Sequence, residues 1–120
     1  MAPKSVFLGR MWRGPADIRK ALFGGTGEVS VSNLVATPPA PFDCALGCVL
    51  SPGGSVGTHV QSECAELVIV ISGTGVATVA GADVPLRAGV TVAVPLGATL
   101  AFQADDIEPL YYVIVKAKAR

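Results

Sequence analysis

The segment spanning residues 57–67, GTHVQSECAEL, holds the residues best suited to do chemistry. His59 is the only histidine of the chain, and Gln61 and Glu66 follow it closely. Residues two apart on a strand project from the same face, so His59 and Gln61 share a face, and Glu66 on the next strand can converge on them. Imidazole and carboxylate ligands suit Zn, Fe, Ni or Mn, and the same pair can act as an acid–base centre.

The donors in this segment leave several interpretations open. Gln61 offers a metal only a neutral carbonyl oxygen, whereas Cys64 offers a strong thiolate donor if it turns toward the site and is otherwise a buried apolar filler. Without a metal, His59 and Glu66 form either a buried, hydrogen-bonded pair with a structural role or a general acid or base that acts near neutral pH.

The elements around this segment are predicted to be strands. The chain has 120 residues, enough for one domain, with 51% hydrophobic and 15% charged residues, 14 Gly and 9 Pro. EVSVSNLVA alternates polar and apolar residues, and further short apolar runs are separated by Gly and Pro turns, which is typical of a β-sandwich or barrel. ELVIVIS is apolar on both faces, so we expect one face to meet the core and the other a second sheet or a second subunit.

The N-terminal part differs from this pattern. Residues 1–14 have mixed character and are predicted to form a short strand or arm. GPADIRKALFGG has a turn signal, a run that favours helix and a Gly-Gly stop, which predicts one short helix from Ala16 to Phe23. The sequence thus predicts an N-terminal arm and helix over residues 1–25 and a barrel domain over residues 26–120.

The glycines, His59 and Glu66 together form a pattern that resembles the cupin superfamily. Its first motif, Gly-x5-His-x-His-x3–4-Glu-x6-Gly, is matched by Gly53, His59, Glu66 and Gly73, with Gln61 in place of the second His. Its second motif, Gly-x5-Pro-x-Gly-x2-His-x3-Asn, is matched by Gly89, Pro95 and Gly97, with Leu100 and Ala104 in place of His and Asn. The resemblance implies an all-β cupin jelly-roll barrel.

The resemblance also implies a metal site in the barrel, at His59, Gln61 and Glu66. Two of the three family imidazoles are replaced here, so we expect this site to be weak or vestigial, with Leu100 filling the place of the missing imidazole. No cofactor is expected; if one binds, we expect a weakly held divalent transition metal, namely Zn, Ni, Mn or Fe. His59 and Glu66 are then predicted to lie within hydrogen-bond or shared-metal reach of each other.

The remaining interior positions are mostly apolar. The candidate pocket residues are Leu46, Cys48, Val68, Leu100 and Phe102. Such a lining fits a small hydrophobic pocket with a few orienting polar groups, and equally a filled core without a cavity. Tyr111 or Tyr112 supplies a possible acid, since one of the two must face inward, and Tyr112 is the candidate.

Two classes of function follow from these residues. The first is a protein that binds a small apolar or weakly polar molecule beside a degenerate metal site. The alternative is a cupin enzyme: a metal-dependent oxygenase or isomerase, or a metal-free isomerase or lyase that uses His59 and Glu66 as catalytic residues with Tyr112. Metal-free epimerases of the superfamily also need basic residues for nucleotide phosphates, and Arg87 is the only basic residue expected in the barrel strands.

Charge and hydropathy limit the kinds of partner that the sequence allows. The net charge is zero, which argues against nucleic acid, and no apolar run is long enough to span a membrane. The start of the chain lacks the apolar core of a signal peptide, and three cysteines without framework spacing fit reduced thiols, so we expect a cytoplasmic protein. The low charged fraction and the two-sided strand ELVIVIS predict a homodimer.

Overall fold

The computed structural model describes Trp12 and residues 15–118, and in this part the chain folds almost entirely into β-strands. One short 3-10 turn, η1, spans Leu22–Gly24. The strands are β1 (Ala16–Lys20), β2 (Glu28–Asn33), β3 (Phe42–Leu50), β4 (Ser55–Val60), β5 (Cys64–Ser72), β6 (Gly75–Val79), β7 (Ala82–Leu86), β8 (Thr91–Val94), β9 (Thr99–Ala104) and β10 (Leu110–Lys118).

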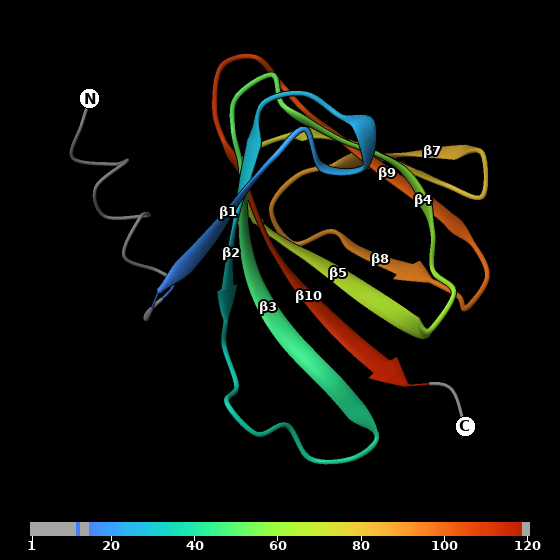
Figure 1. The fold of residues 1–120 in the computed structure, drawn as a ribbon. Coiled ribbons are helices and arrows are strands. Elements are labelled where there is room, and N and C mark those ends of the chain that lie inside the picture. Colours follow the sequence, from blue (N-terminus) through green and yellow to red (C-terminus); the bar gives the residue numbers. More distant parts are fainter. Residues whose placement is uncertain (1–11, 13–14, 119–120) are drawn as a thin grey trace.

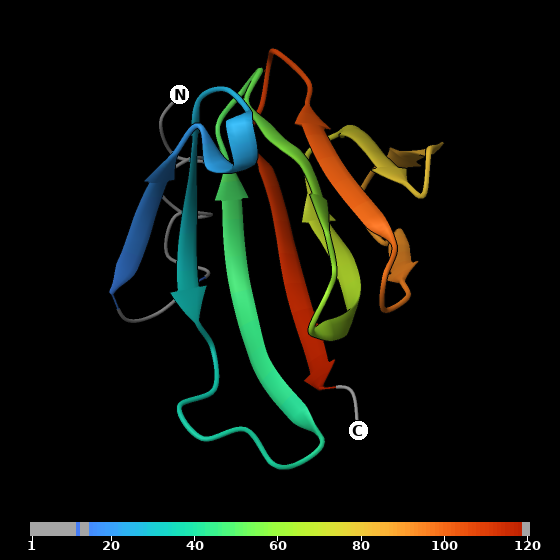
Figure 2. The same cartoon turned by 45° about the vertical axis from the view of Figure 1, so that its right-hand side comes forward.

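The strands form two sheets that face each other (Figure 1). The larger sheet has the order β1-β2-β3-β10-β5-β8, and the smaller has the order β4-β9-β6-β7. Strands β3 and β10 run side by side through the middle of the larger sheet, with β5 on the other side of β10 (Figure 2). All strand pairs are antiparallel, and the chain crosses repeatedly between the sheets, so the predicted jelly-roll barrel is confirmed.

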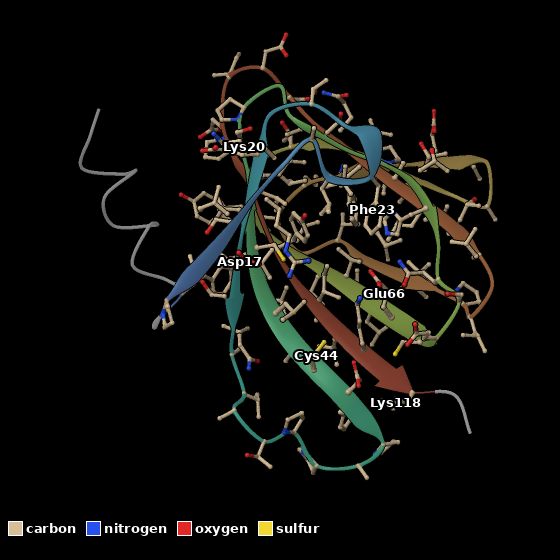
Figure 3. All side chains as sticks on the ribbon, in the orientation of Figure 1. Asp17, Lys20, Phe23, Cys44, Glu66 and Lys118 are labelled. Carbon is tan, nitrogen blue, oxygen red and sulfur yellow. The ribbon has the colours of Figure 1, made fainter. Side chains whose placement is uncertain are left out.

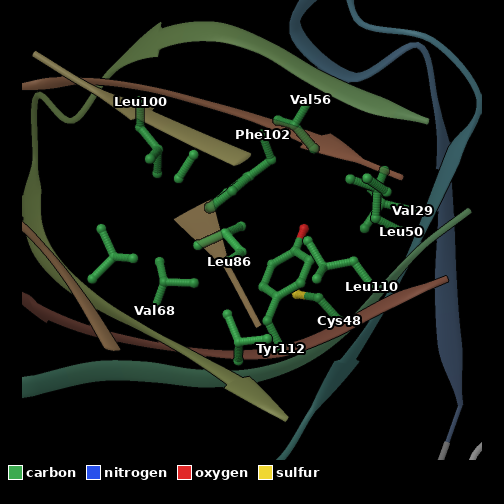
Figure 4. Close-up of a cluster of buried hydrophobic side chains, with 14 of the residues drawn as sticks. Val29, Cys48, Leu50, Val56, Val68, Leu86, Leu100, Phe102, Leu110 and Tyr112 are labelled. Atoms are coloured by element: carbon green, nitrogen blue, oxygen red, sulfur yellow. The ribbon is translucent and has the colours of Figure 1, made fainter. Parts of the chain in front are cut away.

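The alternation of β5 explains how one strand serves two environments. Val68 and Val70 point inward and are fully buried, whereas Leu67 and Ile71 lie on the outer face and are exposed. Inward residues from both sheets form a single core, which Figure 4 shows around Phe102, Leu86, Leu110 and Tyr112. Burial of these apolar side chains supplies the main driving force for closing the two sheets on each other.

The turn after β5 shows why a motif glycine is needed. Gly73 has a φ of 90°, and a Cβ at this position would overlap the backbone carbonyl of Pro109. Any other residue would therefore carry both backbone strain and a clash. This constraint explains why the spacing of glycines was informative about the fold.

The predicted helix from Ala16 to Phe23 is wrong. Ala16–Lys20 is strand β1, paired with β2 from Ala16 opposite Ser32 to Lys20 opposite Glu28, and only the 3-10 turn η1 follows it. A helix of eight residues is marginal in isolation, while strand pairing at the edge of an existing sheet satisfies the same backbone groups. The expected strand or arm over residues 1–14 falls, except for Trp12, outside the described residues.

Within the described residues, no helix is long and apolar enough to cross a membrane.

Candidate functional site

The residues of the candidate site surround a cavity of about 420 Å³ between the two sheets. His59 comes from β4, Gln61 from the loop that follows it, Glu66 from β5 and Tyr112 from β10, and all four line this cavity. The apolar pattern was compatible with either a small pocket or a filled core. The cavity shows that the barrel is not completely filled. Its size lies in the range of small-molecule sites.

The imidazole of His59 uses both ring nitrogens. Nδ1 lies 2.9 Å from the carbonyl oxygen of Gly57, which can only accept, so Nδ1 carries the proton and donates. Nε2 lies 3.1 Å from Nε2 of Gln61, and with the amide oriented this way the Gln61 N–H donates to the ring. These two bonds define one neutral tautomer, protonated at Nδ1. The lone pair on Nε2 accepts the hydrogen bond from Gln61.

Phe23 covers the face of His59. Their ring centroids are 4.0 Å apart with an angle of 13° between the rings, a stacked arrangement. Phe23 belongs to η1 and adopts a left-handed backbone conformation, with φ of 52°. Sequence reasoning missed this contact because Phe23 was assigned to a helix, and no local signal linked it to a residue 36 positions later in the chain.

Glu66 is the unusual polar group of the cavity. Its side chain projects from β5 toward the space between the sheets (Figure 3), and only 4% of the residue is exposed. Neither carboxyl oxygen has a hydrogen-bond partner among the residues that the structure describes. Burial raises the pKa of Glu66, and the positive charge of Lys116, directly opposite on β10, opposes this rise without reversing it.

His59 and Glu66 were expected to lie within hydrogen-bond or shared-metal reach; they line the same cavity, and no hydrogen bond joins them. His59 bonds Gln61 and Gly57 instead, and among the described residues the Glu66 oxygens have no partner. The reason is local geometry. Gln61, two residues after His59, projects to the same side, so its amide and not Glu66 contacts the ring.

Tyr112 is the inward-facing member of the tyrosine pair. It is buried, its ring packs against Phe102 at a centroid distance of 5.0 Å, and it lines the cavity, whereas Tyr111 does not. Burial raises the pKa of Tyr112 well above its usual value, and the neighbouring Cys48 and Glu66 and a hydrogen bond with Cys48 act in the same direction. The Tyr112 hydroxyl thus keeps its proton near neutral pH.

The apolar candidates divide into two groups. Leu46, Cys48, Leu100 and Phe102 line the cavity, whereas Val68 lies in the closed core and is not among the lining residues. Cys48 is buried, and burial followed by the charge of Glu66 raises the pKa of its thiol to about 12. All three cysteines are free thiols.

Four charged residues at the cavity escaped sequence analysis. Arg19, Asp43, Glu63 and Lys116 line it, whereas Arg87, the one basic residue expected in the barrel, does not. Arg19 and Lys116 lie near the two ends of the sequence, where charged residues are commonly solvated. Strand β1 and the end of β10 bring them to the barrel mouth. For Lys116 the signal was the alternation of β10, which places it on the same face as Tyr112.

The donor set does not fit a tightly held transition metal. Leu100 lies directly opposite His59 on the neighbouring strand, where a further ligand would be needed, and both nitrogens of His59 are engaged. Among the residues that the structure describes, no group of three or more His, Cys, Asp or Glu side chains lies close enough to hold a metal ion. Cys64 does not complete such a group.

A family model for the cupin domain matches residues 48–116, more than half of the chain. The chain belongs to the cupin family. This assignment agrees with the two motifs and with the jelly-roll sheet order, and the search of curated proteins found no significant match.

Solved cupin structures resemble the chain closely in fold. A predicted oxalate decarboxylase from Thermotoga maritima superposes with a TM-score of 0.81 at 24% identity, covering 87% of this chain and 92% of that one. A cupin 2 conserved barrel domain protein from Salinispora arenicola gives 0.69 at 26% identity, covering 91% and 90%. A cupin-2 domain from Rhodospirillum rubrum gives 0.72 at 18% identity, covering 92% and 75%.

Proposed function

We propose that this cupin binds a small apolar or weakly polar molecule in the barrel cavity, without a metal. The observation that carries the proposal is the unpartnered Glu66 carboxyl group beside an open cavity of about 420 Å³ that polar and apolar side chains line together. A buried acceptor without a partner costs free energy in the absence of ligand, and a ligand that supplies a donor recovers it.

The alternative, a cupin enzyme, receives less support. A general base needs a free lone pair, and the Nε2 lone pair of His59 accepts a hydrogen bond from Gln61. Glu66 does not orient His59, and burial raises the pKa of Tyr112 well above its usual value, which makes its hydroxyl a weak acid. A metal-dependent oxygenase or isomerase meets the further difficulty of Leu100 opposite His59.

The oxalate chemistry named for the Thermotoga protein is also not favoured here. Oxalate is a dianion, and Glu66 would place an unpartnered carboxyl group beside it. Like charges in a poorly solvated site repel strongly. The basic side chains of Arg19 and Lys116 lie at the same cavity, but Arg19 is already paired with Asp17 at 2.9 Å.

The proposal is tested by filling the cavity. Leu46 lines it and is only partly buried, so we expect Leu46→Trp to occupy the space without abolishing folding. Binding of phenethyl alcohol, followed by NMR shifts of the cavity residues, should weaken about tenfold or more in this variant. Ile107→Trp, at an exposed loop position outside the cavity, is the control and should bind normally. Absence of binding to the natural protein would count against the function.

For assembly, we propose a homodimer formed through the outer face of the larger sheet. Leu67 and Ile71 are exposed there, and a shallow apolar hollow of about 230 Å³ lies beside them, lined in part by Phe42, Leu67 and Val115. A face of this kind suits an isologous contact. Light scattering should give twice the 12.2 kDa chain mass, and Leu67→Glu should reduce it to a monomer. Ile107→Glu, in an exposed loop, should leave the mass unchanged.

A further inference from the structure

We infer that the ligand of the cavity is a compact apolar molecule that carries a protonated amine, and that this amine donates its hydrogen bonds to Glu66. The inference rests on the proposed function and specifies the class of ligand. It depends on three features of the cavity: an acceptor without a donor, the charges around it, and the apolar wall beyond it.

The acceptor is Glu66. Only 4% of the residue is exposed, and neither carboxyl oxygen has a hydrogen-bond partner within the described part of the chain. The side chains opposite it on the same face are Val94 on β8, which has no donor, and Lys116 on β10, which forms no salt bridge with it. An amine supplies the missing donors, and a hydrogen bond between an ammonium and a carboxylate is stronger than one between neutral groups.

The charges around the cavity select the sign of the ligand. The lining residues include two basic side chains, Arg19 and Lys116, and three acidic ones, Asp43, Glu63 and Glu66. Arg19 is paired with Asp17, and Asp43 lies 3.6 Å from Lys118, so both have partners outside the cavity. The remaining lining charges are then the ammonium of Lys116 and the carboxyl groups of Glu63 and Glu66, an excess of one negative charge when Glu66 is ionised. A cation neutralises this excess, whereas a carboxylate increases it.

The rest of the ligand is received by apolar side chains. The apolar part of the cavity wall is formed by Val56, Leu100 and Phe102 from the smaller sheet and by Leu46 and Ile114 from the larger one. His59 offers no free acceptor on this side, because Gln61 already donates to Nε2. The ligand therefore places one cationic group at Glu66 and an aliphatic or aromatic body against the wall.

Three probes of similar shape test the inference on the natural protein: phenethylamine, phenethyl alcohol and hydrocinnamate, with calorimetry near neutral pH. The amine should bind at least about tenfold more tightly than the alcohol, and the carboxylate should bind most weakly. If the alcohol binds and the amine is no better, the inference fails and the proposed function stands. If none of the three binds, both fail.

Matched variants identify the acceptor. Glu66→Gln keeps the size of the side chain and should bring the amine and the alcohol to similar affinity. Glu28→Gln changes net charge equally at an exposed position of β2 outside the cavity and should keep the preference for the amine. A preference that survives Glu66→Gln overturns the inference. Thermal melts confirm that each variant is folded, and the three-probe comparison needs no variant.

Discussion

His59 on β4 lies directly opposite Leu100 on β9, in the antiparallel register that joins these two strands. Directly opposite residues in such a pair point to the same side of the sheet, so the isobutyl group of Leu100 stands beside the imidazole inside the barrel. Leu100 is 1% exposed and lines the same cavity. This pairing puts an aliphatic side chain where the cupin motif has an imidazole, and it is one reason why we propose an organic ligand without a metal.

The first prediction concerns restoration of a metal site. Gln61→His with Leu100→His adds two imidazoles beside His59, and we expect the double variant to bind Zn, Ni or Mn, because imidazole and carboxylate ligands together suit these ions. Calorimetry with each ion compares it with the natural protein and with Leu100→His alone, which should bind less tightly. Stoichiometric, tight metal in the natural protein as purified would contradict the interpretation of its donor set.

The second prediction concerns Glu66 and pH. Folding raises the pKa of Glu66 above its usual value of 4.5, so the native protein holds this proton more tightly than the unfolded chain. The resulting stability is fully present below pH 4.5 and is lost as pH rises through the folded-state pKa. Glu66→Gln removes this loss. Its stability relative to the natural protein should therefore rise as pH rises through the folded-state pKa of Glu66.

Chemical denaturation at a series of pH values measures this difference. Glu28→Gln is the control, since Glu28 is exposed, and the difference between it and the natural protein should not follow the same trend. A parallel pH dependence of Glu66→Gln and the natural protein would show that Glu66 finds a partner in solution.

The third prediction concerns the turn that covers His59. A Cβ on Gly57 would overlap the backbone carbonyl of Phe23, so Gly57→Ala should displace η1 and separate the stacked rings. We expect a loss of about 1–3 kcal/mol in unfolding free energy. Because His59 is the only histidine, its ring protons report the stacking directly by NMR.

Phe23→Leu separates the two effects of Gly57→Ala. Phe23 is 56% exposed, so this change should shift the His59 ring protons while costing little stability. Unchanged His59 signals in both variants would show that the rings do not stack in solution.

The fourth prediction concerns thiol reactivity. Cys48 is buried and its pKa is raised to about 12, so it is almost entirely protonated at mildly alkaline pH. Cys44 is only partly buried, and its pKa is raised mainly by burial. Iodoacetamide should therefore modify Cys44 well before Cys48 in the native protein, as read by peptide mass spectrometry. In denaturant the three thiols should react at similar rates, and early modification of native Cys48 would contradict its burial.

Much of the fold was predictable because its constraints are local. The alternation of apolar residues predicts strands, and backbone positions such as Gly73, where φ is positive and a Cβ would clash, restrict the residue type. The spacing of His59 and Gln61 predicted a shared face, and the ring and amide are in contact. These relationships need only the period of a strand, which sequence reveals directly.

Which side chains line the site, and which of them are paired, depended on contacts between segments distant in the chain. Ala16–Lys20 became a strand because β2 offered it a pairing edge, and that pairing carried Arg19 to the cavity mouth and Phe23 onto His59. The Glu66 carboxyl group lacks a partner because its neighbours from β8 and β10, nearly 30 and 50 residues away, do not supply one. Sequence by itself determined the fold and the identity of the polar groups. The tertiary structure decided which of them bond each other and which has no partner among the described residues, because hydrogen-bond partners are set by distance in space.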